Sequence, residues 1–449
     1  MTKHYKIKKG LDIKLHGEAE KVVSNISVKQ IAVKPTDYLG VTPKLLVKEG
    51  AQIKAGDIVF SDKKREYLRF TSPVSGIVKE IVRGEKRVIQ EIIIEQDEVQ
   101  EFVDFGKSSI NDLSKEQIVE KMLKSGVWNF IRQRPYNIIA NPEDTPKAIF
   151  ISAFDSAPLA PDFDLEIGLN QDVFQRGIDV LSKLTTGKIH LNIHEFRNRK
   201  SLYENIKGVQ LNCFSGPHPS GNIGIQIHHI EPINKGDIVW HINVLDILSL
   251  AKLFIEGHYT HKKLIALTGS EIKRPRYYRV NAGTSVSELL VNNLKRDNVR
   301  VISGNVLSGE KISKKGFLGA YHNHITVIPE GNHYSFLGWI LPGFKKFSVS
   351  KTYTAWLLPN RKYNLHTNIN GGQRPFVMTG IYEKYFPMDI MPMQLSKAIL
   401  AKNLDMMENL GIYEINPEDV ALCEVVCPSK IEMQEIIAQG LEFIQKEMS

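Results

Sequence analysis

The chain has 449 residues, of which 42% are hydrophobic and 24% charged, and its formal net charge is +8. At roughly 100–200 residues per domain, this length predicts about three domains. The composition is that of an ordinary globular protein, so disorder, collagen and a disulfide scaffold are excluded for the chain as a whole. The three cysteines, Cys213, Cys423 and Cys427, are typical of a reducing compartment.

The first ten residues carry four lysines and no apolar run, so we expect no signal peptide. No stretch approaches the roughly 18 apolar residues that a membrane-spanning helix needs. We therefore expect a soluble chain, or one held at a membrane by partners. Nucleic acid is not an expected partner, because clustered arginines with interleaved aromatic residues are missing. The excess basic charge fits scattered surface lysines or docking beside a membrane.

Residues 1–100 have the pattern of a β-rich domain. Alternating and β-branched residues recur in short runs, and glycines separate the runs. The stretches 47–59 and 72–81 resemble the biotinyl/lipoyl-carrier β-sandwich. Carriers of that family present one lysine on a hairpin for a covalent arm. Here the hairpin bears the basic run Lys63, Lys64 and Arg65, which favours a structural hairpin over an attachment site.

Residues 101–270 predict a Rossmann-like parallel α/β domain. A helix over 114–125 has Ser114 as its N-cap and Gly126 as its stop. Strands and helices then alternate, as in a sheet with crossover helices. The expected strands are 148–153, 188–193, 208–214 and 264–268, and the expected helices are 170–184 and 244–255.

Three further segments follow. Residues 271–335 have the pattern of a strand, a helix and further strands, which suggests a β-grasp (SLBB-like) module. Residues 336–388 are rich in proline, glycine and aromatic residues without a clear period, and we expect an ordered linker that wraps other domains. Residues 389–449 predict a helical domain, with 3.6-residue spacing in 393–409 and 430–446.

Common catalytic and metal motifs are missing. The sequence has no phosphate-binding G-x-x-x-x-G-K-[ST] loop, no G-x-G-x-x-G after a strand and no G-x-S-x-G elbow. His190 and His194 are four residues apart, but they fall in a predicted strand, where that spacing separates the side chains too far for one metal. We therefore predict no catalytic residue and no metal site.

One cysteine motif is informative. Cys423-x₃-Cys427-Pro428 matches the second half of the bacterial ferredoxin run C-x₂-C-x₂-C-x₃-C-P. The first two cysteines of that run would fall at Pro417 and Val420, which cannot ligate iron. The segment is therefore a degenerate ferredoxin-like motif, inherited from an electron-transfer lineage or produced by chance spacing.

Taken together, these features resemble the family of A subunits of the Na⁺-translocating NADH:quinone reductase of bacterial membranes. The resemblance covers nearly the whole chain and rests on five short stretches: 6–13, 83–88, 215–221, 239–246 and 423–430. That family is similar to the C subunit of the Rnf complex and to the NADH-binding flavoprotein of complex I. The resemblance implies a peripheral protein on the cytoplasmic side of the bacterial inner membrane, bound to the other subunits of the reductase, with membrane subunits among them.

The same resemblance bears on cofactors. The flavoprotein relatives carry a loop G-x-G-G-A-G-F-P whose backbone N–H groups hold the flavin phosphate. The corresponding stretch here keeps only Gly126 and Pro135, and bulky side chains stand where the backbone must touch a ligand. We therefore expect a degenerate flavin site and no redox cofactor on this chain.

The emptied flavin site predicts a quinone site. Aromatic rings and arginines suit a flat headgroup whose carbonyl oxygens accept hydrogen bonds. The alternative is that the aromatic residues merely fill the emptied cleft. The expected quinone-binding residues are Trp128, Phe130, Arg132, Arg134, Tyr136 and His218.

Two functions remain open. The first is a cofactor-free, quinone-associated subunit of a complex that couples NADH oxidation and quinone reduction to Na⁺ export; the isolated chain is then not catalytic. The second is a soluble NADH-dependent flavoprotein or an Rnf-type electron-transfer subunit.

Overall fold

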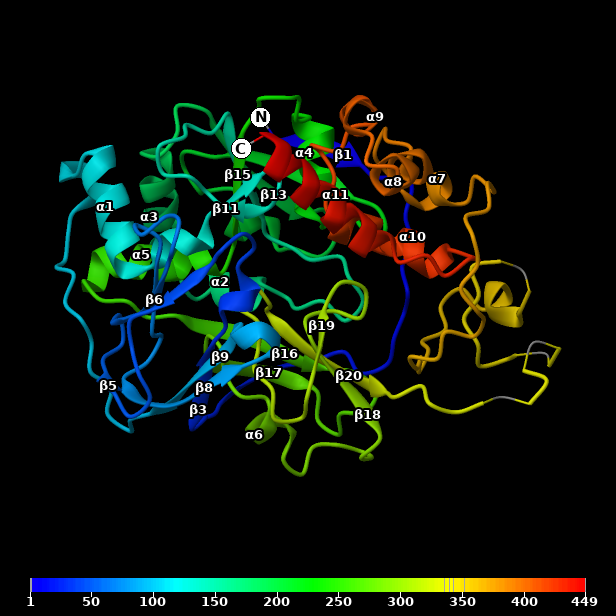
Figure 1. Cartoon of the computed structure of the whole chain (residues 1–449), viewed down its shortest axis with the longest axis horizontal. Coiled ribbons are helices and arrows are strands. Elements are labelled where there is room, and N and C mark those ends of the chain that lie inside the picture. The colour runs from blue at the N-terminus through cyan, green and yellow to red at the C-terminus, as the bar shows by residue number, and fades with distance from the viewer. Residues whose placement is uncertain (1, 335, 339, 342, 351, 449) are drawn as a thin grey trace.

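The computed structural model describes residues 2–448 except 335, 339, 342 and 351. Within these residues the strands form four sheets of seven, six, four and three strands. Figure 1 shows the two larger sheets in different parts of the molecule, with the C-terminal helices beside the first of them.

The seven-stranded sheet is the core of the α/β domain. Five neighbouring strands are parallel, and an antiparallel hairpin of two strands closes one edge. In sheet order the strands are β1 (Lys3–Lys6), β14 (Gln210–Ser215), β13 (Lys188–His194), β12 (Ala148–Ser152), β15 (Val239–Asn243), β10 (Arg132–Arg134) and β11 (Ile138–Ile139). The parallel strands agree with the expected α/β class.

Side chains of the central strands alternate between two cores. Ile149 and Ile151 of β12 belong to the same core cluster as residues of α3 (Gln171–Ser182) and α5 (Asp246–Glu256). Phe150 belongs to a second cluster with α4 (Ile223–Ile230) and the C-terminal helices. Such alternation is the period-two pattern of a strand buried on both faces. A further short helix, α2 (Asp164–Ile167), precedes α3.

The six-stranded sheet belongs to the β-grasp part. In order its strands are β19 (Glu310–Ile312), β18 (Val299–Ser303), β20 (His324–Pro329), β16 (Lys262–Thr268), β17 (Arg276–Asn281) and β2 (Glu20–Asn25), and α6 (Ser287–Leu290) packs on it. The expectation that 264–268 completes the α/β sheet is wrong, because β16 pairs with β17 and β20. Its apolar pattern predicts a strand but does not specify the partner.

The sandwich consists of the two smaller sheets. One contains β3 (Gln30–Val33), β9 (Ile89–Gln96), β8 (Gly76–Arg83) and β5 (Gln52–Ile53), and the other contains β4 (Pro43–Leu45), β6 (Ile58–Asp62) and β7 (Arg69–Thr71). The rings of Phe60 and Phe70 stack in its interior with their centroids 4.3 Å apart. The alternating apolar residues therefore fold as two packed β-layers, as expected.

The first 25 residues lie outside the sandwich. β1 pairs in parallel with β14 of the α/β sheet, and β2 pairs in parallel with β17 of the β-grasp sheet. The sequence-based segment 1–100 therefore combines the sandwich with one edge strand for each of the two other sheets. The sequence pattern predicts neither β1 nor β2 as a strand, and their partners lie more than 200 residues away.

Helix α1 (Lys115–Ser125) follows the sandwich, as its sequence predicts. The side chain of Ser114 accepts a hydrogen bond from the backbone N–H of Gln117. The side chain of Gln117 in turn accepts one from the backbone N–H of Ser114. This capping box fixes the start of the helix, and Gly126 ends it with a left-handed φ of 79°.

The C-terminal part is helical. Its helices are α7 (Tyr382–Tyr385), α8 (Pro392–Leu400), α9 (Leu404–Asn409), α10 (Ala421–Val426) and α11 (Met433–Met448). The single helix expected over 393–409 is divided, because Lys402 adopts φ 52° and Asn403 caps a new helix. Among the described residues, no helix combines the length and apolarity needed to cross a bilayer.

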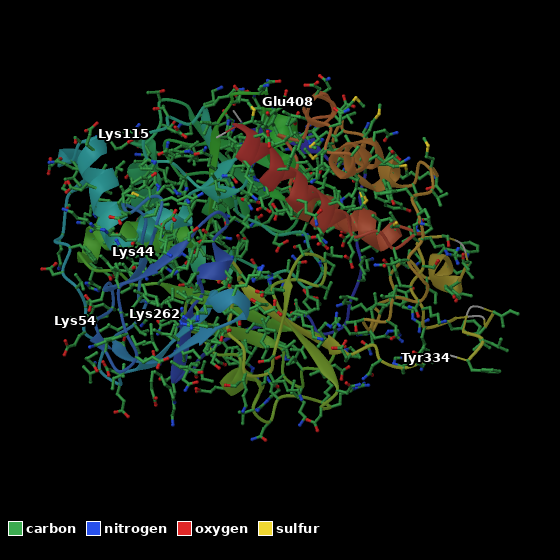
Figure 2. The ribbon with its side chains drawn as sticks, in the orientation of Figure 1. Lys44, Lys54, Lys115, Lys262, Tyr334 and Glu408 are labelled. Atoms are coloured by element: carbon green, nitrogen blue, oxygen red, sulfur yellow. The ribbon has the colours of Figure 1, made fainter. Side chains whose placement is uncertain are left out.

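The expected linker 336–388 contacts distant parts of the chain where the structure describes it. Tyr363 is buried beside Ile13, Leu15 and Leu422. The surface elsewhere carries many charged side chains, and Figure 2 shows Lys44, Lys54 and Lys115 projecting from the sandwich and from α1.

Ile7→Ala tests the N-terminal strand. Ile7 follows β1 and is 2% exposed in the core shared by the sheet and the C-terminal helices. The cavity should lower the free energy of unfolding by about 2–5 kcal/mol. Val22→Ala on β2 is the control, because Val22 is 48% exposed and should change stability by less than about 0.5 kcal/mol. Equal effects in chemical denaturation would contradict the pairing of β1 with the core.

Candidate functional site

The order of the parallel strands places a cleft at one edge of the α/β sheet. From β12 the chain moves outward through β13 and β14, and it then returns to β15 on the other side of β12. Crevices form at such switch points, outside the carboxyl ends of the strands. Ser152 and Asn243, which pair at these ends, both line a cleft of about 1030 Å³.

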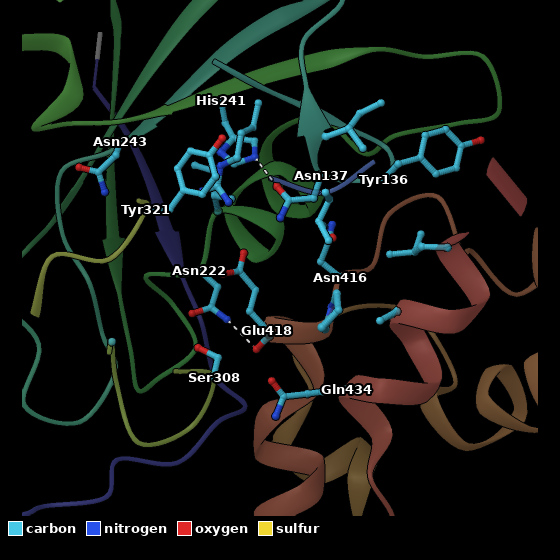
Figure 3. Close-up of a pocket in the computed structure, with 18 of the residues that line it drawn as sticks. Tyr136, Asn137, Asn222, His241, Asn243, Ser308, Tyr321, Asn416, Glu418 and Gln434 are labelled. Carbon is cyan, nitrogen blue, oxygen red and sulfur yellow. Dashed lines mark hydrogen bonds between the residues drawn. The ribbon is translucent and has the colours of Figure 1, made fainter. Parts of the chain in front are cut away.

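Four parts of the chain surround this cleft. The α/β domain contributes Arg132, Tyr136–Ile138 and the ends of β12 and β15, and the β-grasp part contributes loops at 304–308 and 321–324. The C-terminal part contributes 416–418 and one face of α11, and the sandwich hairpin contributes Lys64 and Arg65. Figure 3 shows Asn222, Asn416 and Glu418 below His241 and Tyr321, on the same open space.

Arg132 and Tyr321 form one wall. The guanidinium of Arg132 lies over the ring of Tyr321, 4.4 Å from its centroid. The Tyr321 hydroxyl donates to the backbone oxygen of Asn129 at 2.9 Å. This bond and the cation–π contact hold the two side chains together, so the wall presents a cation stacked on an aromatic ring.

His241 is a neutral donor beside this wall. Its Nε2 donates to Asn137 Oδ1 at 3.0 Å, because that oxygen can only accept. Burial, reinforced by the positive charges of Arg132 and Arg134, holds the pKa of His241 well below its usual value. The imidazole is therefore uncharged near neutral pH.

Arg134 lies behind the opposite wall. It is 1% exposed, its Nη2 contacts Glu418 Oε1 at 2.8 Å, and its Nη1 lies 3.8 Å from Asp419 Oδ2. Asn222 donates to the backbone oxygen of Glu418 at 3.0 Å. These contacts attach the C-terminal segment to the edge of the α/β sheet and form the cleft's lower side (Figure 3).

The six residues predicted to bind quinone are not brought together. Of these six, Arg132 and Tyr136 line the cleft. Figure 3 shows the Tyr136 ring pointing away from the centre of the cleft. The ring packs edge-on against Tyr413, with the two centroids 6.4 Å apart.

Trp128, Phe130 and Arg134 lie in the interior, so the expectation that they line the cleft is corrected. Trp128 is fully buried, donates to the Ala140 backbone oxygen at 2.7 Å and packs edge-on against Trp240. Phe130 packs on the His261 ring with centroids 4.4 Å apart. The short 3₁₀ turn Val127–Phe130 faces inward, which makes its aromatic residues core filler as the alternative interpretation proposed.

His218 also lies outside the cleft lining. It is 4% exposed, and its Nδ1 is 3.0 Å from Ser156 Oγ. Burial lowers its pKa to about 4, so it is neutral at pH 7. Its backbone N–H donates to Asp12, which connects the loop 215–221 to the N-terminal segment.

Gly126 has a local role. A Cβ at this position would lie 2.7 Å from Thr71 Oγ1, so the residue allows α1 to end against the sandwich. The glycine that survives from the relatives' flavin loop is therefore explained by the helix end and by close packing.

Cys423 and Cys427 are both buried. Cys427 Sγ lies 2.9 Å from the Tyr382 hydroxyl, and burial raises the pKa of the Cys423 thiol far above its usual value. Pro417 and Val420 lie in the 3₁₀ turn Pro417–Val420. In the part of the chain that the structure describes, no three His, Cys, Asp or Glu side chains are grouped as a metal would require.

Sequence reasoning missed most of the cleft. Tyr321, Asn222, Asn243 and His241 come from loops and strand ends far apart in the sequence, and no motif connects them. The residues at the strand ends are nevertheless predictable in principle, because polar residues that follow buried parallel strands meet at one edge of the sheet.

Comparison with known proteins now assigns the family. Three domain families match: the NqrA N-terminal barrel-sandwich hybrid domain over residues 5–97, the NqrA second alpha/beta domain over 113–259 and the NQRA C-terminal domain over 264–314. The A subunit of the Na⁺-translocating NADH-quinone reductase of Photorhabdus laumondii is 38% identical over 98% of this chain and 99% of its own length. The chain belongs to this family of A subunits.

Other relatives agree. The corresponding proteins of Yersinia pestis and Haemophilus influenzae are each 37% identical over 98% of this chain and 99% of their own length. An NAD⁺-reducing [NiFe]-hydrogenase structure matches with a TM-score of 0.40 and 10% identity over 76% of this chain and 62% of its own, and it carries no argument. The family resemblance and the mixed α/β multidomain fold predicted from the sequence are thus confirmed, and the chain is a subunit of an enzyme complex.

Arg134→Met tests the lower wall of the cleft. The substitution keeps most of the side-chain volume but leaves Asp419, which is fully buried, without its cation. We expect the free energy of unfolding to fall by about 3–5 kcal/mol. In the control, Lys44→Met removes an exposed ion pair to Glu66 and should cost less than about 1 kcal/mol. If the two variants unfold alike, Arg134 is not a buried anchor.

Proposed function

We propose that this chain is a quinone-associated peripheral subunit of the Na⁺-translocating NADH:quinone reductase and carries no redox cofactor of its own. In this role it binds the other subunits of the complex, membrane subunits among them, on the cytoplasmic side of the bacterial inner membrane. Nucleic acid has no part in it. The family membership supports the complex, and the cleft at the β12/β15 switch point supports the quinone.

The cleft combines the two features that a quinone headgroup requires. Arg132 and the Asn137 amide, whose oxygen is held by His241, are donors on one side, and the Tyr321 ring offers a flat surface beside Arg132. Because carbonyl oxygens accept hydrogen bonds while the ring and tail are apolar, such a mixture favours a quinone over a charged nucleotide. Apolar surface nearby comes from Phe154, Phe163 and Ile242.

The cofactor-free assignment rests on where bulky residues lie. Trp128 and Phe130 occupy the stretch that holds flavin phosphate in the relatives' loop, and both are packed into the core. Displacing either ring would open a cavity costing about 3–5 kcal/mol. Cys423 and Cys427 lie inside the C-terminal core, where Tyr382 contacts Cys427. Neither site is arranged for the group it resembles.

Arg132→Gln tests quinone binding. A short-chain quinone titrated into the wild-type chain should bind with roughly millimolar to micromolar affinity. Removing the cation should weaken that affinity about tenfold, since a charge-assisted hydrogen bond contributes about 1.5–3 kcal/mol. Arg176→Gln is the control, because Arg176 is exposed on α3 and lies outside this cleft. Wild-type binding that is absent, or that survives Arg132→Gln unchanged, would refute the quinone site.

A visible spectrum tests the cofactor assignment. The purified chain should show no flavin absorption at about 450 nm and no stoichiometric iron, because the loop and the cysteine pair that would hold these groups are packed into the core. The chain alone should also fail to reduce quinone with NADH. Stoichiometric flavin would favour the alternative function, a soluble NADH-dependent flavoprotein or Rnf-type electron-transfer subunit.

A further inference from the structure

One loop of the linker exposes a group of apolar side chains to solvent. We define the apolar loop as those residues between 334 and 358 that the structure describes. Tyr334, Phe336 and Phe344 are 104%, 89% and 63% exposed. Several large apolar side chains exposed within one short segment indicate an interaction surface, because singly scattered exposed residues are the usual case on a soluble protein. Further apolar side chains of the loop that are at least half exposed are Ile340, Leu341, Trp356, Leu357 and Leu358.

The apolar loop is attached at a defined base. The backbone N–H of Gly331 donates to Thr367 Oγ1 at 2.8 Å, and Asn368 Nδ2 donates to the His333 oxygen at 2.6 Å. Thr367 also donates to Glu330, which pairs with Arg300 at 2.7 Å. Figures 1 and 2 show the loop projecting beyond the β-grasp sheet, with Tyr334 far from the bulk of the molecule. The apolar side chains are thus held at the outside.

The charged residues in this stretch of the sequence have one sign, although Lys362 pairs with Glu18 from the N-terminal segment. From residue 331 to residue 382 the sequence contains no Asp or Glu but six cations: Lys345, Lys346, Lys351, Arg361, Lys362 and Arg374. Lys345 is exposed beside Phe344, and Lys346 lies over the Tyr353 ring at 5.2 Å. Aromatic and aliphatic residues mixed with lysines are typical of segments that enter the interface of an anionic bilayer.

We propose that the apolar loop docks directly on the anionic lipid surface of the membrane. Tyr334, Phe336 and Phe344 insert among the headgroups, and Lys345 with its neighbouring cations meets the lipid phosphates. A membrane subunit is a poorer occupant, because cytoplasmic loops of such proteins are themselves rich in Lys and Arg and would repel this segment. The contact goes beyond the proposed function, which requires attachment through partner subunits alone.

Vesicle binding by the full chain tests this docking. Sedimentation with phosphatidylglycerol-containing vesicles should show affinity at least about tenfold higher than with pure phosphatidylcholine vesicles, and raised salt should weaken it. Phe336→Ser/Phe344→Ser should lower the affinity for anionic vesicles about tenfold or more, since both lose apolar burial. Lys345→Glu should also lower it, because one attraction becomes a repulsion.

Matched controls separate docking from general stickiness. Leu169→Ser/Phe196→Ser removes two side chains that are 71% and 81% exposed elsewhere on the surface, and it should bind anionic vesicles like wild type. All variants should keep their unfolding transition. Quinone titration should also be unchanged in the loop variants, so failure of the quinone site and failure of lipid docking are distinguishable.

Several results would overturn the proposal. The proposal is wrong if the wild-type chain does not bind anionic vesicles or binds both vesicle types equally. It is also wrong if the loop variants bind anionic vesicles as well as wild type does. An equal loss in the control variant would show that any exposed apolar residue suffices. Loop-dependent self-association in light scattering without vesicles would assign the surface to a second copy of this chain instead.

Discussion

The buried carboxylate of Asp246 fixes the arrangement of the parts around the cleft. It begins α5 and lies 3.2 Å from His261 Nε2 and 3.7 Å from Lys263 Nζ, at the start of the β-grasp sheet. All three side chains are at most 5% exposed. Burial opposes ionisation, but Lys263 and His261 outweigh it and keep the pKa of Asp246 below its usual value. A buried charge is costly without its partners, so this ion pair fixes the α/β and β-grasp parts relative to each other.

That relation also positions the wall of the cleft. Lys263 donates to the backbone oxygen of Ala320, and Asp37 of the sandwich accepts from the Ala320 N–H at 2.7 Å. The next residue is Tyr321, and the guanidinium of Arg132 lies over its ring. Three parts of the chain therefore converge on two consecutive residues, and the proposed quinone site lies where none of them alone would form a pocket.

Local features were predictable from the sequence, while long-range partners were not. The cap at Ser114 and the stop at Gly126 specify α1 within a few residues, because their hydrogen bonds are local. By contrast, the prediction that β16 belongs to the α/β sheet is wrong, because an apolar strand suits either the α/β sheet or the β-grasp sheet. The sequence predicts Arg134 in the cleft as a donor to quinone oxygens, and it gives no sign of the interior partner Glu418, which is 284 residues away. The position of Arg132 at the cleft was anticipated, but Tyr321 and His241 lie at strand ends and loops without a motif.

The pairing of β1 with β14 has a consequence for synthesis. Lys3 pairs with Asn212, and Glu20 pairs with Arg276, so during synthesis these residues meet their partners only after two hundred or more further residues have been added. At ~5–20 residues per second, the N-terminal segment waits roughly 10–50 s without its sheet. Meanwhile the sandwich, whose strands are close in sequence, is free to form. The edge strands β1 and β2 therefore pair after the sandwich has formed, and they are exposed to other chains for that interval.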